Sequence, residues 1–136
     1  MDSPRIQLIK NAFRLFEEEG IEAATEGLLS ISHPDCEYRP FSATGRVLRG
    51  QEETRAFFLD SAGPGRSFRV RPQRFEEEGE LVTVSGSIRV HHESGGFSET
   101  QVRWTYRFRD GLVERASWEP RFGTEPAADQ LPALAE

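Results

Sequence analysis

Residues 79–122 constrain the fold of this chain more than any other part of the sequence. Two short segments, Ser94-Gly95-Gly96 and Asp110-Gly111, supply residues that tolerate the backbone angles of tight hairpin turns. They divide the stretch into three runs that are long enough for strands. The expected strands cover residues 80–92, 97–109 and 112–122. Consecutive hairpins of this kind predict an antiparallel meander.

The middle run alternates between two kinds of side chain. Large apolar residues take every second position, and arginine or threonine takes the positions between them: Val102, Trp104, Tyr106 and Phe108 alternate with Arg103, Thr105, Arg107 and Arg109. A period of two predicts a strand with one apolar and one polar face. A sheet with one apolar face needs a cover, and the first third of the chain offers helices for it.

Ser3-Pro4 is typical of a helix start, because serine caps free N–H groups and proline fits the first turn. Apolar residues then recur at helical spacing until Gly20, at Ile6, Ile9, Phe13 and Phe16. The expected elements that follow are a helix at 22–29, a break at 33–35, a short strand at 36–41, a helix at 51–61 and a strand at 68–75. Gly86 lies inside a long strand, which indicates a bend or a bulge there.

The predicted order is α-α-β-α-β-β-β-β, with helices early and strands late. We expect an α+β fold in which a cone-shaped, curved antiparallel sheet wraps around the N-terminal helices and leaves a cavity beside the first helix. Residues 1–123 are expected to form a single domain. Residues 124–136 turn to Ala, Pro, Glu and Asp and are expected to be a loosely held tail.

Composition excludes several classes of function. The 136 residues carry a net charge of −6, which argues against a general nucleic-acid binder because phosphate needs a dominant positive field. The single cysteine, Cys36, excludes an internal disulfide and a cysteine-based metal cluster. Three histidines form no metal set, so we expect neither a metal nor a cofactor. No long apolar run opens the chain, so we expect a protein of the cytoplasm without a membrane span.

The sequence resembles the superfamily of nuclear transport factor two, ketosteroid isomerase and SnoaL-like polyketide cyclases. Four segments carry the resemblance: residues 16–20 at the end of the first helix, 33–40, 50–58 and 106–113. It covers about residues 5–122 and implies a cystatin-like α+β barrel with a small-molecule ligand in a central cavity. It also implies a homodimer formed through the outer face of the sheet. One fold hosts many functions, so the resemblance is specific for fold and not for chemistry.

The resemblance does not extend to the catalytic groups of ketosteroid isomerase. That family uses a tyrosine on the first helix, an aspartate base before the proline of the first strand and a protonated aspartate on the penultimate strand. These positions hold Phe13, Arg39 and Trp104 here. Proton abstraction beside a carbonyl needs a tuned base and a donor for the enolate, so we do not expect steroid isomerase activity.

Two residues are candidates for catalytic roles. Arg39 in the cavity would recognise a carboxylate or phosphate through its planar fork; the alternative is an ion pair with Glu37. His92 shares a strand face with Val90 and would act as a pocket base, because imidazole titrates near neutral pH; the alternative is a solvated strand end. If the first strand slips by one residue, Tyr38 replaces Arg39 in the cavity.

Large amphipathic side chains are candidates for ligand binding. They would shape the cavity for an apolar or aromatic ligand, with indole N–H and phenol O–H groups as orienting donors, or they would simply fill the core. The candidates are Phe13, Tyr38, Phe57, Trp104, Tyr106 and Trp118. A further group of arginines is expected on the outer sheet face, either as a polyanion-binding stripe or in cross-strand ion pairs with residues such as Glu99. They are Arg69, Arg71, Arg89, Arg103 and Arg107.

Two functions remain open on the sequence alone. The first is a SnoaL-like small-molecule pocket that could serve a cofactor-independent acid–base enzyme of isomerase, cyclase or hydratase type, in which Arg39 anchors an oxygen and His92 moves a proton. The second is a non-catalytic binding or dimerisation module of the same fold. Two or more polar groups that converge in a closed cavity would favour the enzyme, and a core filled with Phe and Trp would favour the module.

Overall fold

The computed structural model describes residues 2–40, 46–60, 66–92 and 95–120, and for residues 66–68 and 92 the backbone only. The helices are α1 (Pro4–Glu19), α2 (Ile21–Ser30) and α3 (Gly50–Asp60). The strands are β1 (Ser32–Pro40), β2 (Leu48–Arg49), β3 (Arg66–Glu78), β4 (Leu81–His92), β5 (Phe97–Arg109) and β6 (Leu112–Pro120). They form one sheet in the order β2-β1-β6-β5-β4-β3.

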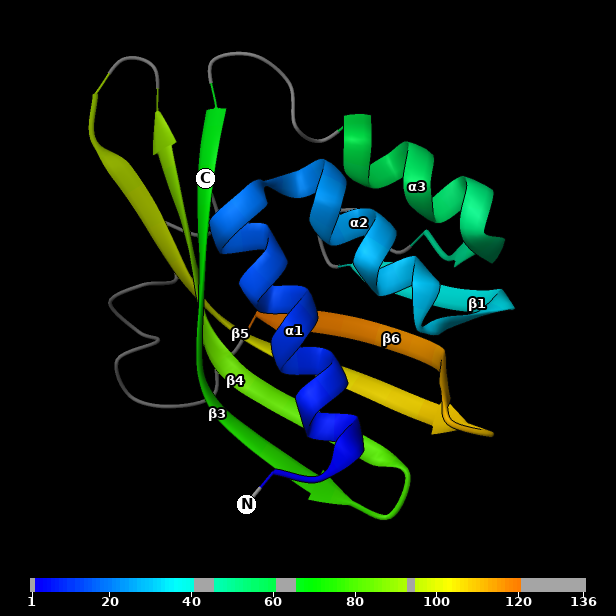
Figure 1. Ribbon diagram of the computed structural model, residues 1–136. Coiled ribbons are helices and arrows are strands. Elements are labelled where there is room, and N and C mark those ends of the chain that lie inside the picture. Colours follow the sequence, from blue (N-terminus) through cyan, green and yellow to red (C-terminus); the bar gives the residue numbers. More distant parts are fainter. Residues whose placement is uncertain (1, 41–45, 61–65, 93–94, 121–136) are drawn as a thin grey trace.

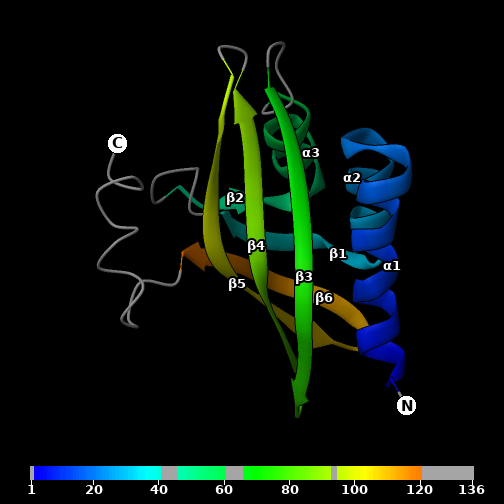
Figure 2. The same ribbon diagram turned by 90° about the vertical axis from the view of Figure 1, so that its left-hand side faces the viewer.

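The helices lie on one side of a strongly curved sheet (Figures 1 and 2). The long strands β3, β4 and β5 bend along their length, and α1 lies inside the bend (Figure 1). The sheet does not close on itself, because β2 and β3 end its strand order and do not pair with each other. The predicted α+β architecture, with a curved sheet around N-terminal helices, is confirmed.

Three details of β1 and β2 differ from the expectation. β2 was not foreseen, and β1 pairs with β6 in parallel, so the sheet is mixed. The expected break at 33–35 lies within β1. Pro34 is tolerated there because the β1–β6 register shifts between Ser32 and Glu37, where no regular ladder requires its missing N–H. The predicted tail, 124–136, lies outside the described residues.

Both ends of α1 follow the sequence signals. The Ile6 amide donates a hydrogen bond of 3.2 Å to Ser3 Oγ, which caps the helix, and Pro4 occupies its first turn. Gly20 ends the helix with φ at +102°, a conformation that favours glycine. None of the helices in the described part of the chain is long and apolar enough to cross a membrane.

A bulge in β3 bends the sheet around α1. The β3–β4 register shifts between Pro72 and Arg74, so that Val70 faces inward before the bulge and Phe75 after it. Gly86 lies opposite Pro72, and a Cβ atom at Gly86 would stand 2.2 Å from the Arg71 carbonyl oxygen. The bulge therefore depends on a close backbone approach that only glycine permits.

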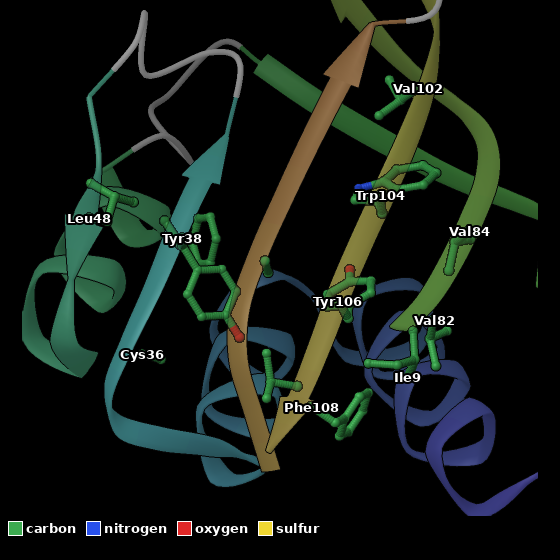
Figure 3. Close-up of a cluster of buried hydrophobic side chains, with 13 residues drawn as sticks. Ile9, Cys36, Tyr38, Leu48, Val82, Val84, Val102, Trp104, Tyr106 and Phe108 are labelled. Atoms are coloured by element: carbon green, nitrogen blue, oxygen red, sulfur yellow. The ribbon is translucent and has the colours of Figure 1, made fainter. Parts of the chain in front are cut away.

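The core fills the concave side of the sheet. Phe108 is fully buried on β5, and Trp104 on the same strand packs edge-to-face on Phe13 of α1 with ring centroids 5.1 Å apart. Figure 3 shows the even-numbered side chains of β5 in one row, with Ile9 of α1 among the buried residues that the view includes. The apolar alternation of the sequence thus becomes the inner face of the sheet.

The register of β1 places Tyr38 inward and Arg39 outward. Tyr38 is fully buried, and its hydroxyl lies 2.7 Å from Ser32 Oγ. Arg39 has a side chain 58% exposed and an ion pair of 3.6 Å with Glu37. The placement of Arg39 in the cavity is therefore corrected. A buried guanidinium would need a charged partner there, whereas the tyrosine buries its ring and satisfies its hydroxyl.

We predict that Gly86→Ala destabilises the fold, because the added Cβ would collide with the backbone of the β3 bulge. The expected loss in the free energy of unfolding is about 1–3 kcal/mol, measured by urea denaturation. Ser85→Ala, on the neighbouring residue, serves as the control and is expected to stay within about 0.5 kcal/mol of the parent. Equal stability of Gly86→Ala and the parent would contradict the close approach.

Candidate functional site

A cavity of about 360 Å³ lies between the helices and the inner face of the sheet. Its volume falls in the lower part of the range for small-molecule sites, roughly 300–1,000 Å³. Seven aromatic side chains line it, from α1, α3, β5 and β6: Phe13, Phe16, Phe57, Phe58, Trp104, Tyr106 and Trp118. No described residue of the lining is a Lys, Arg, His, Asp or Glu. The site is thus an apolar, aromatic chamber.

Ring-to-ring packing fixes the shape of two walls. On one side Phe13 meets Trp104 at 5.1 Å and Phe75 at 6.1 Å, both edge-to-face. On the other side Phe58 stacks on Trp118 at 5.5 Å. Aromatic pairs in these geometries hold their side chains in defined positions beyond what burial alone gives. The cavity therefore has preformed flat surfaces.

Tyr106 supplies the most distinctive polar group of the lining. Its side chain is almost fully buried, and its hydroxyl has no hydrogen-bond partner among the described residues. Burial raises the pKa of Tyr106 far above its usual value. The phenol therefore remains protonated at neutral pH and is a ready hydrogen-bond donor.

A second hydroxyl in the lining is already used. Thr25 Oγ1 donates to the Ile21 carbonyl oxygen at 2.7 Å within α2. Such a bond back to the preceding turn satisfies the hydroxyl locally. Tyr106 is thus better placed than Thr25 to serve a ligand.

The structure brings five of the predicted ligand-binding residues together around the cavity. They are Phe13, Phe57, Trp104, Tyr106 and Trp118. Tyr38, the sixth, is not part of the lining. Its ring stands behind the wall, edge-to-face with Phe58 at 6.1 Å and with Trp118 at 6.0 Å. Tyr38 therefore supports the two rings that face the cavity.

The two predicted catalytic residues do not meet in this cavity. Arg39 points to the outer surface of β1, where it pairs with Glu37. His92 ends β4, where its backbone pairs with Arg66, and its side chain lies outside the described residues. The structure therefore does not support Arg39 as the group that anchors a ligand oxygen beside a His92 base.

The sequence reasoning missed some lining residues that a simple signal would have found. Pro40 lines the cavity because it lies two residues beyond Tyr38 on the same strand face. On α2, Ile21, Thr25 and Leu28 share one helical face toward the cavity through their spacing of three and four residues. No group of three or more His, Cys, Asp or Glu within the described ranges is arranged to hold a metal ion.

Solved structures with this fold include several with bound small molecules. An NTF2-like protein of unknown function from Burkholderia pseudomallei matches with a TM-score of 0.75 and 20% identity, over 99% of this chain and 100% of that one. TerC, co-crystallised with polyporic acid, matches with a TM-score of 0.73 and 25% identity, over 88% of this chain and 92% of that one.

A third similar structure is RV0760c from Mycobacterium tuberculosis in complex with estradiol-17beta-hemisuccinate. Its TM-score is 0.68 at 20% identity, over 86% of this chain and 93% of that one. No curated protein matches the sequence significantly.

The family comparison agrees with the fold. The model of the SnoaL-like domain family matches residues 11–116, which run from α1 through most of β6. This range contains nearly all of the cavity lining and the complete β3–β5 meander. The chain therefore belongs to the family of SnoaL-like domains.

Proposed function

We propose that this chain is a small-molecule-binding protein whose cavity takes a flat, apolar or aromatic ligand with one hydrogen-bond-accepting oxygen. The observation that carries the proposal is the hydroxyl of Tyr106, which is buried in an aromatic lining without a partner among the described residues. A hydrogen bond from this hydroxyl to a ligand oxygen would contribute about 0.5–1.5 kcal/mol to binding.

The shape of the cavity supports a ring compound. Trp104 and Trp118 stand on neighbouring strands, directly opposite each other in the β5–β6 register, and both face the cavity. Flat side chains of this kind gain most from contact with another flat surface. The comparisons support the same class, because TerC was crystallised with polyporic acid and RV0760c with an estradiol derivative.

The charge of the lining favours binding over acid–base catalysis. A general base must lie within hydrogen-bond reach of the proton that it removes, and the described lining contains no carboxylate or imidazole. Burial raises the pKa of Tyr106, so its hydroxyl stays protonated at neutral pH and no phenolate is present to accept a proton. Its chemistry in this setting is donation to an oxygen.

An acid–base enzyme with His92 as the base is the second candidate. Ile88 and Val90 line the cavity from β4, and strand alternation puts position 92 on the same face of β4. In this function Tyr106 would donate to the substrate oxygen while the imidazole moves a proton.

A homodimer through the outer sheet face and a location in the cytoplasm also stay predictions.

We predict that Tyr106→Phe removes the preference of the cavity for a ligand oxygen. The parent should bind 2-acetylnaphthalene more tightly than 2-ethylnaphthalene, which has the same shape without the carbonyl. The expected difference is between about two- and tenfold, the usual net value of one hydrogen bond. Both tryptophans of the chain line the cavity, so quenching of their fluorescence reports its occupancy.

Tyr38→Phe is the matched control, because it removes the hydroxyl of the chain's other tyrosine, which bonds to Ser32 outside the cavity. This variant should keep the preference for the ketone. Equal affinities of the parent for the two probes would show that the Tyr106 hydroxyl does not select the ligand. If neither probe binds to the parent, the proposed function is overturned.

His92→Gln separates the two candidate functions. A base in the cavity would exchange the hydrogens beside the carbonyl of 1-tetralone in D₂O, and NMR follows that exchange directly. For a binding protein we expect exchange at the rate of the buffer in both the parent and the variant. Catalysed exchange that His92→Gln abolishes would instead establish the enzyme.

A further inference from the structure

A second, open hollow lies along β3, the edge strand of the sheet. We call it the basic hollow, because four of the residues that line it are Arg69, Arg71, Arg89 and His91. Glu17, at the C-terminal end of α1, is the one acid among its described lining residues. The cluster stands out in a chain whose net charge is −6.

The arginines of the basic hollow outnumber their partners. Arg69 lies directly opposite Arg89 in the β3–β4 register, and like charges in that position repel each other. Glu99 bonds directly to only one of them: one carboxylate oxygen accepts from Arg89 at 3.0 Å and the other from Ser87 at 2.8 Å. The hydrogen bonds from Ser87 and Arg89 lower the pKa of the Glu99 carboxyl, and the nearby charges of Arg89 and Arg71 lower it further. Arg69 and Arg71 form no ion pair with any described residue.

Arg89 also carries an unused donor. Its Nε atom is buried and has no hydrogen-bond partner among the described residues. Buried polar atoms are normally paired, so an unpaired one marks a place where a partner is missing. A guanidinium with a free N–H next to two unpaired guanidinium groups is suited to an oxyanion, because each presents donors in a planar fork.

The basic hollow and the apolar cavity adjoin each other. Phe16 at the end of α1 and Val70 on β3 belong to the lining of both. Figure 1 shows the C-terminal part of α1 beside β3. The arginines of the basic hollow lie on the opposite face of β3 from Val70, and the two hollows adjoin at the edge of the sheet.

We propose that the ligand of this protein is an amphiphilic acid, with its apolar rings in the cavity and its carboxylate, sulfonate or phosphate group in the basic hollow. The inference rests on the proposed function and adds the second half of the ligand. It follows from the charges: the described cavity lining has no cation to neutralise an acid, and at the adjoining hollow three arginines face two acids, Glu99 and Glu17. Burial of an unpaired anion in the cavity itself would be strongly unfavourable.

The test uses two dyes with one ring system. 8-Anilinonaphthalene-1-sulfonate carries a permanent anion, and N-phenyl-1-naphthylamine is its neutral parent; both fluoresce in apolar sites. Combined replacement by Arg69→Gln and Arg71→Gln should weaken the sulfonate dye on the order of tenfold. The neutral dye should keep its affinity within about twofold, because cavity contacts are unchanged.

Two further variants control for surface charge and for folding. Arg103→Gln removes an exposed arginine of the same sheet face that does not line the basic hollow, and should leave both affinities unchanged. Glu17→Gln should strengthen binding of the sulfonate dye, because it removes the acid that opposes the anion. Partly unfolded protein also binds this sulfonate dye, so the gain supports the inference only if the Glu17→Gln variant has the melting temperature of the parent; melting temperatures of all variants complete the control.

The outcomes separate this inference from the proposed function. Displacement of the sulfonate dye by the neutral dye, together with the selective loss in the Arg69→Gln/Arg71→Gln variant, supports a single amphiphilic ligand. Equal effects of the double variant on both dyes, or sulfonate binding that the neutral dye does not displace, overturn the inference and leave the cavity intact. Failure of both dyes to bind the parent overturns the proposed function as well.

Discussion

The contact between a bent apolar sheet and the first helix determines the rest of this structure. β5 presents Trp104 and Phe108 on its inner face, and α1 meets them with Phe13 and Ile9. A flat sheet would leave most of this face uncovered, because one helix covers only a narrow band of it. The bulge opposite Gly86 curls the sheet around α1 and thereby buries the face. The cavity lies between the helices and the inner face of the sheet, where the curved sheet is wider than α1 can fill.

The bend also separates two chemical environments on one strand. Before the bulge, β3 turns Val70 toward the apolar cavity, while Arg69 and Arg71 line the basic hollow. Adjacent residues of a strand point to opposite faces, so one short segment contributes to both sites. The edge position of β3 lets the two hollows meet along the shared wall formed by Val70 and Phe16.

The architecture was predictable from the sequence where a strong local pattern exists. The alternation along residues 102–109 correctly predicted which side chains of β5 face the core. Ser3-Pro4 and Gly20 correctly marked the two ends of α1. Gly86 indicated the bend because glycine inside a strand often marks a bulge or a tight bend. Each of these signals acts within a few residues and needs no knowledge of distant contacts.

The candidate site was less predictable because the inward placement of Arg39 rested on the family resemblance and not on the local pattern. In the run from Cys36 to Pro40, Cys36, Tyr38 and Pro40 alternate with the charged Glu37 and Arg39, and this period of two favours Tyr38 on the inner face. The deciding contacts are distant in sequence: Tyr38 packs against Phe58 of α3 and Trp118 of β6. The parallel pairing of β1 with β6 has the same origin, since it joins segments separated by five other elements.

The edge strand β3 has a consequence for how this chain behaves at high concentration. A strand of 13 residues at the rim of a sheet offers unsatisfied amides and carbonyls to any other molecule. Here Pro72 removes one amide, the bulge interrupts the ladder, and charged side chains occupy both halves of the strand. Proline, a bulge and charged side chains all disfavour pairing of one edge strand with another. The bulge that bends the sheet around the cavity thus also disfavours edge-to-edge aggregation of this protein.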